Sequence, residues 1–93
     1  MRKQRFESVW DAIEDIPAEA ANMKARAELM IAIAEYIRAR KLTQAAAAKL
    51  FRVSQPRVSD LMRGKIDLFS VDTLVNMLAA AGVRVELRLK KAA

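Results

Sequence analysis

Two short helical segments joined by a tight turn constrain the fold of this chain more than any other feature. The first runs through "QAAAAKLF" after Thr43, and the second begins with "SQPRVSDLM" at Ser54. Thr and Ser are good N-caps, because their hydroxyl accepts a hydrogen bond from a free N–H of the first helical turn. Pro56 falls in the first turn of the second segment, where its missing N–H removes no intrahelical bond. The pattern predicts two consecutive helices with fixed starting points.

The apolar positions of these segments fit two helices that pack against each other. With Gln44 as the first residue of the unit, the inward positions are Ala47, Phe51, Val53, Val58 and Leu61. Ala48 falls where the helices approach most closely, and a larger side chain there would push them apart. The residues left on the start and outer face of the second helix are Gln55, Arg57, Ser59 and Asp60. This is the arrangement of a helix-turn-helix, whose second helix enters the major groove of DNA.

Further helices are predicted on both sides of this unit. Phe6, Val9, Trp10 and Ile13 have helical spacing, which predicts a short N-terminal helix. Pro17 suits the first turn of a new helix that continues to Arg40, as one helix or two. Its apolar stripe is Leu29, Ile33 and Ile37, flanked by Met30 and Tyr36. After the loop "GKIDLF", Ser70 caps another helix, which Gly82 ends as a C′ residue.

The C-terminal residues change from a helical period to strict alternation. Val83, Val85, Leu87 and Leu89 alternate with charged residues, which predicts a half-buried β-strand. A single strand leaves its backbone groups unpaired, so we expect it to pair with the same strand of a second copy across a two-fold axis. An antiparallel register with Arg84 opposite Glu86 would alternate charge signs favourably. These four apolar residues are the predicted dimer interface, and a disordered basic tail is the alternative.

Composition narrows the possible partners. The 93 residues carry a net charge of +6, and residues 42–93 account for nine cations against four anions. A basic surface of this kind favours polyanions such as nucleic acid. The chain has no histidine or cysteine, so a Ser-His or Cys-His catalytic pair and a thiolate zinc site are excluded. We expect no enzyme, cofactor or metal site. No apolar run is long enough to span a membrane, and we expect a cytoplasmic protein.

The polar residues of the helix pair match the chemistry of DNA recognition. Glutamine can bond adenine through two hydrogen bonds, as Gln55 could, and Arg57 could bond guanine in the same way. Asp60 could accept from a cytosine amine. Thr43, Gln44 and Ser54 lie at helix N-termini, where N–H groups favour phosphate oxygens. The predicted DNA-binding residues are Thr43, Gln44, Ser54, Gln55, Arg57, Ser59, Asp60, Arg63 and Lys65.

The stretch "LTQAAAAKLFRVSQPRVSDLMRGK" resembles the helix-turn-helix of lambda-repressor-like (XRE-type) regulators. The following "IDLFSVDTLVNMLAAAGVRVEL" and the upstream "SVWDAI" and "KARAELMIAIAEYI" resemble the HigA-like antitoxins and small regulators of that group. The resemblance implies an all-α fold of five helices, homodimerisation and repression of a promoter. For many relatives it also implies neutralisation of a RelE-like toxin ribonuclease. Arg52 departs from the family, which usually has glycine in the turn, because this position tends to need a positive φ.

Three regions follow from this interpretation: an arm and short helix over 1–16, a DNA-binding domain over 17–82 with its helix-turn-helix at 43–62, and a strand and basic tail over 83–93. The predicted function is a sequence-specific repressor that binds operator DNA as a homodimer, and that serves as the antitoxin of an operon it autoregulates. The alternative is a protein-interaction module that neutralises a RelE/HigB-like toxin and binds DNA only secondarily. The cations of the helix pair favour the repressor, because they would have no role in the alternative.

Overall fold

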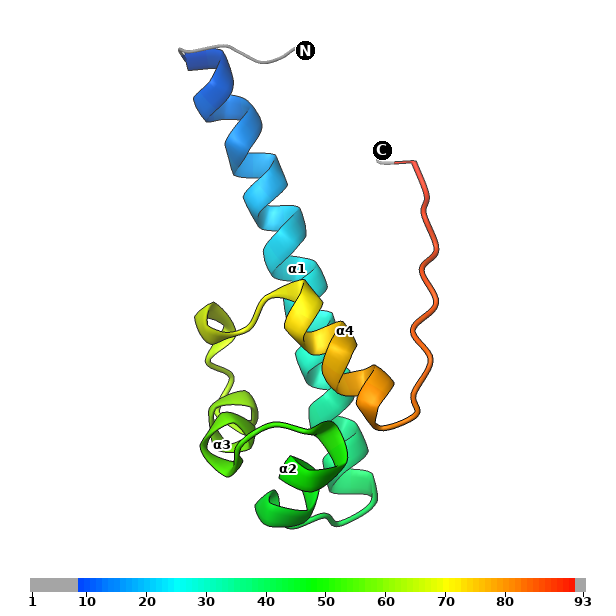
Figure 1. Cartoon of the computed structure of the whole chain (residues 1–93). Helices are drawn as coiled ribbons and strands as arrows, with labels where there is room; N and C mark the ends of the chain where they lie inside the picture. The colour runs from blue at the N-terminus through cyan, green and yellow to red at the C-terminus, as the bar shows by residue number, and fades with distance from the viewer. Residues whose placement is uncertain (1–8, 92–93) are drawn as a thin grey trace.

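The structure is a computed structural model that describes the backbone of residues 9–91 and the side chains of residues 18–91. Over these residues the chain is all-helical, with four α-helices and one short 3₁₀ helix (Figure 1). The long helix α1 (Val9–Ala39) runs through the molecule, and the helix pair α2 (Gln44–Phe51) and α3 (Gln55–Met62) packs around its C-terminal half. The 3₁₀ helix η1 (Ile66–Leu68) leads into α4 (Val71–Ala80), which also lies against α1.

Helix α1 differs from the predicted division of the N-terminal region. The short helix expected within residues 1–16 and the helix expected from Pro17 form one continuous element. Pro17 stands in its interior, although a proline there removes one backbone hydrogen bond and crowds the preceding turn. The strong helix formers that follow Pro17 keep the chain helical beyond it. The predicted arm before Val9 lies outside the described residues. The described residues therefore form four α-helices and the 3₁₀ helix η1, so the expected five α-helices are not found among them.

The core is built where α1, the helix pair and α4 meet. Helix α1 buries Ile33 and Ile37 of the predicted stripe, together with Met30, and leaves Leu29 and Tyr36 half-buried. The helix pair contributes four buried side chains, which are Ala47, Phe51, Val58 and Leu61. Loop and α4 residues complete the cluster with Phe69, Leu74, Met77 and Leu78. The predicted inward positions of the helix pair are thus confirmed, with Val53 and Ala48 packed at its margin.

The expected capping residues set the ends of the helices after α1. The Ser70 hydroxyl accepts a hydrogen bond from the Thr73 N–H at 3.1 Å and so starts α4. Gly82 has a φ of +78°, the left-handed conformation that is common at the C′ position after a helix and that glycine adopts easily. Its N–H donates to the Ala79 carbonyl at 3.0 Å, and the Val83 N–H donates to Leu78 at 2.9 Å. These two bonds form a Schellman motif that turns the chain back along the molecule.

Residues 83–91 form an extended segment and not the predicted β-strand. Figure 1 shows this segment leaving the end of α4 and running back beside the helices. A strand needs a neighbouring chain for its ladder of hydrogen bonds, and the described part of this single chain offers none. The single chain therefore does not show the predicted strand, whose expected partner was a second copy. Among the described residues, no helix combines the length and apolarity that crossing a bilayer requires.

Candidate nucleic-acid interface

The start of α2 exposes two of the predicted DNA-binding residues. Thr43 is extended, and its hydroxyl accepts a hydrogen bond from the Ala46 N–H at 3.1 Å. This bond fixes the first turn of α2 and leaves Gln44 exposed on it. Farther along the same helix, Ala47 and Phe51 are buried. The helix is therefore anchored by its far half, and its N-terminal end remains free to meet a ligand.

The start of α3 is capped and exposed in the same way as the start of α2. The Ser54 hydroxyl accepts a hydrogen bond from the Arg57 N–H at 3.3 Å, and Pro56 occupies the first turn. Val58 and Leu61 fix the helix against the core with 1% and 3% of their surface exposed. Gln55 consequently lies on the open side at the helix start, whereas Ser59 is half-buried. Of the residues predicted to read bases, Gln55 is the most accessible.

The turn between α2 and α3 has the conformation that the sequence predicted. Arg52 has φ 59° and ψ 46°, which is the left-handed region where glycine is usual. Its backbone N–H donates to the Ala48 carbonyl, and the Val53 N–H donates to the same oxygen at 3.0 Å. The Arg52 side chain is exposed. The turn therefore keeps its helix-turn-helix geometry with an arginine, at the cost of a strained backbone.

Arg57 is bonded within the protein and is half-buried. Its Nη1 donates to the Leu68 carbonyl at 3.1 Å, and its guanidinium carbon lies 5.4 Å from the centre of the Phe69 ring. A guanidinium has five N–H donors, so this one bond leaves donors for a second partner. The bond fixes the direction of a side chain that the sequence identified only as a candidate guanine contact.

The loop after α3 carries the other predicted cations. Arg63 is exposed, and the Lys65 Nζ lies 3.6 Å from the Asp60 carboxylate. The loop is tied to α1 as well as to α3, because Arg26 Nη1 donates to the Ile66 carbonyl at 3.2 Å. The structure thus gives Arg26 a role in placing this loop. Sequence reasoning missed it, since one arginine in a helix of mixed charge carries no signal of a contact forty residues away.

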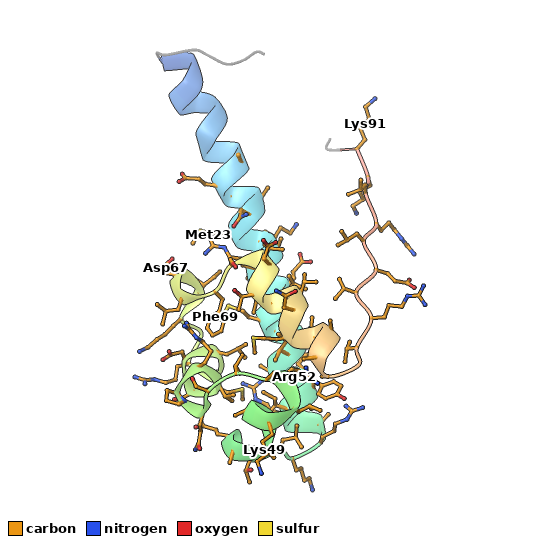
Figure 2. All side chains as sticks on the ribbon, in the orientation of Figure 1. Met23, Lys49, Arg52, Asp67, Phe69 and Lys91 are labelled. Atoms are coloured by element: carbon orange, nitrogen blue, oxygen red, sulfur yellow. The ribbon has the colours of Figure 1, made fainter. Side chains whose placement is uncertain are left out.

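The charge of the helix pair and its loop is strongly positive. Residues 43–65 hold five cations, Lys49, Arg52, Arg57, Arg63 and Lys65, and their single anion is Asp60. Lys49 lies at the end of the molecule opposite the start of α1 (Figure 2). Asp60 is itself paired with Lys65, which reduces its repulsion of an approaching phosphate. The polar helix starts and the surrounding cations together suit a double-stranded polyanion.

Comparison with known proteins assigns this arrangement to a family. A sequence model described as a helix-turn-helix domain matches residues 12–90, and the chain belongs to this family. A solved structure described as an XRE family transcriptional regulator is similar to this chain at 34% identity with a TM-score of 0.72. That match covers 80% of this chain and 83% of the other. No curated protein matches the chain. The XRE-type helix-turn-helix predicted from the sequence is thereby confirmed.

Proposed function

We propose that this protein is a sequence-specific transcriptional repressor that binds operator DNA in the cytoplasm as a homodimer. The observation that carries the proposal is the start of α3, where Ser54 caps the helix and Gln55 lies exposed above the buried Val58 and Leu61. A rigid helix with polar residues at its free N-terminal end is what insertion into the major groove requires. The likeness to an XRE family transcriptional regulator supports the same function.

Each predicted contact residue has a role in this proposal. Gln55 and Arg57 read base edges through paired hydrogen bonds, and Ser59 and Asp60 contact bases farther along α3. The capped helix starts at Thr43, Gln44 and Ser54 bind phosphate oxygens through their polar groups. Arg63 and Lys65 neutralise phosphates beside the groove. The homodimer forms through Val83, Val85, Leu87 and Leu89, and so presents two copies of α3 to an operator with two half-sites.

An antitoxin role is the second part of the proposal, and one observation favours it. Helix α1 is exposed at eight consecutive residues, Ala18 to Ala25, on the part of the helix that stands clear of the helix pair (Figure 1). A protein that binds both DNA and a toxin needs a surface for the toxin away from α3, and this part of α1 supplies one. The HigA-like resemblance names a RelE-like ribonuclease as the partner class.

Fluorescence anisotropy with duplex DNA from upstream of this protein's coding region tests the proposal. We expect the native duplex to bind more than about a hundredfold tighter than a scrambled one, because specific complexes exceed non-specific ones by at least that factor. The preference should persist when the salt concentration is raised, although both affinities fall. Gln55→Ala should reduce the preference, and Asn76→Ala, at an exposed polar position on α4, should leave it intact.

Equal and salt-sensitive binding to both duplexes would contradict a repressor that reads this sequence. In that case the cations form a surface that binds polyanions without regard to sequence, and the protein-interaction module becomes the better interpretation. Growth rescue on co-expression with the product of the neighbouring reading frame would then test the antitoxin role directly.

A further inference from the structure

The loop between α3 and α4 is tied to the rest of the protein by two arginine side chains. Arg26 of α1 donates from Nη1 to the Ile66 carbonyl at 3.2 Å, and Arg57 of α3 donates from Nη1 to the Leu68 carbonyl at 3.1 Å. Both acceptors belong to η1, so the two arginines connect the same three-residue helix to α1 and to α3. Figure 2 labels Asp67, the residue between the two acceptors.

The 3₁₀ helix η1 depends on such outside contacts. It has one turn, closed by the bond from the Phe69 N–H to the Ile66 carbonyl at 3.2 Å, and no side chain caps its start. Short 3₁₀ turns have poorer hydrogen-bond geometry than α-helices, so their own bonds hold them weakly. Arg26 donates to the same Ile66 oxygen that closes the turn. The position of the Leu68 carbonyl, two residues later, is therefore set in part by Arg26.

Hydrogen bonding by Arg26 contributes little to stability on balance. Its Nε is buried and has no hydrogen-bond partner among the described residues, and a buried unpaired donor costs free energy. The single bond to Ile66 offsets part of this cost, and the Ile66 oxygen retains the Phe69 N–H if Arg26 is replaced. An apolar group of similar length in place of the guanidinium should therefore leave the stability of the fold almost unchanged. The consequence of Arg26 lies in where it places η1.

We propose that Arg26 is a positioning residue for base recognition by Arg57. The Arg57 guanidinium is held by the Leu68 carbonyl and by the Phe69 ring, whose centre lies 5.4 Å from the guanidinium carbon. Phe69 is fixed in the core with 1% of its surface exposed, whereas the Leu68 side chain is 48% exposed and does not anchor its own carbonyl. Arg26 supplies a hydrogen-bonded anchor from α1. The inference rests on the proposed function, in which Arg57 reads a base, and adds a residue outside the helix-turn-helix that controls this reading.

The direction of the Arg57 guanidinium decides how well it can read a base. Two N–H donors must lie in the plane of guanine to bond it twice. The bond to Leu68 fixes the guanidinium plane, and a shift of η1 turns this plane while the positive charge stays in place. Loss of the Arg26 bond should therefore reduce the base preference. It should leave the salt dependence of binding as it was, because that dependence reflects the number of phosphate contacts.

The test is a double-mutant cycle with Arg26→Met and Arg57→Ala, measured as operator binding by fluorescence anisotropy. Arg57→Ala first identifies the base pair that Arg57 reads, because an operator change at this position weakens the unaltered protein but not the variant. Paired bonds to guanine discriminate about tenfold or more against a wrong base. We expect Arg26→Met to reduce this discrimination to about threefold or less, and to have no further effect on it in the Arg57→Ala background.

Lys24→Met is the matched control, because it removes an exposed cation from the same helix, about 200° around the axis from Arg26. It should leave the discrimination at this base pair unchanged. Thermal unfolding is measured on the same samples, and Arg26→Met should melt within a few degrees of the unaltered protein. Arg26→Gln, whose side chain is too short to reach Ile66, is the second variant should Arg26→Met fail to fold, and it should show the same loss.

A second readout needs no DNA. In NMR measurements on the free protein, the guanidinium hydrogens of Arg57 should exchange with water about fivefold faster, or more, in Arg26→Met, because the bond to Leu68 opens more often. Unchanged exchange would overturn the inference. An equal loss of affinity on every operator, or an effect of Arg26→Met on the discrimination that persists in the Arg57→Ala background, would do the same.

Failure of the inference and failure of the proposed function give different results. An operator preference in which no base pair depends on Arg57 would overturn the inference and leave the repressor. An unaltered protein without operator preference would refute the repressor, whereas the exchange measurement would still show whether Arg26 places the Arg57 side chain.

Discussion

At the scale of the residue, Arg57 connects the proposed DNA-binding face to the rest of the fold. Its bond to the Leu68 carbonyl and its position beside Phe69 hold the side chain in one direction before any DNA binds. A side chain fixed in advance loses less conformational freedom on binding than a mobile one. The same bond links α3 to the loop that carries Lys65. Arg57 therefore holds α3 to this loop in the free protein, and in the proposed complex the same side chain would read a base.

Substitution of Arg57 separates these two contributions. Arg57→Ala should cost about 1–3 kcal/mol of specific DNA binding and relax the preference at one base pair, if the side chain bonds guanine. It should also lower the free energy of unfolding by about 1 kcal/mol, because the bond to Leu68 is lost. Arg57→Lys retains the positive charge but loses the paired N–H donors. The salt dependence of its DNA binding should therefore match that of the unaltered protein, while its base preference falls. The measurements are thermal unfolding and titrations against operators with single base changes.

A loss of affinity that is equal on every operator would assign Arg57 to phosphate binding or to loop placement. An unchanged melting temperature would show that the bond to Leu68 contributes nothing to stability in solution.

At the scale of the element, the helix pair could be predicted almost completely and α1 could not. Caps at Thr43 and Ser54 and the apolar positions between them are local signals, and each of them fixes one feature of α2 or α3. Pro17 is a local signal that the rest of the helix overrides, so one continuous α1 replaced the two helices expected. The predicted strand is not formed in the single chain, because its ladder of hydrogen bonds would need a second chain.

The turn of the helix pair provides a test at this scale. Arg52→Gly should raise the melting temperature by a few degrees, because a non-glycine residue in the left-handed region costs about 1 kcal/mol. Glycine also gains more freedom in the unfolded chain, which offsets part of that benefit. Lys41→Gly, at the other non-glycine position with positive φ among the described residues, should behave similarly, whereas Lys49→Gly inside α2 should destabilise the protein. A clear fall in melting temperature for Arg52→Gly would mean that the arginine side chain makes a stabilising contact that outweighs the strain.

At the scale of the whole molecule, the proposed function gives the opposite ends of the molecule different tasks. The helix pair and its cations form one end, and the free half of α1 with the C-terminal segment extends toward the other (Figure 1). A dimer made through the segment therefore leaves the start of α3 uncovered in both copies. Two copies of α3 held at a fixed separation require an operator whose half-sites have a matching separation.

Insertion of five base pairs between the operator half-sites tests this coupling. DNA turns once in about 10–10.5 base pairs, so the insertion moves one half-site to the opposite side of the duplex, beyond reach of the second α3. The affinity of the unaltered protein should fall about a hundredfold or more, because the advantage of binding both half-sites together is lost. A variant with both Leu87→Ser and Leu89→Ser, which removes two exposed apolar side chains of the proposed dimer interface, should as a monomer bind both operators equally and as weakly as a single half-site. An unaltered protein that is insensitive to the insertion would show that each chain binds DNA independently, even where the two chains associate in solution.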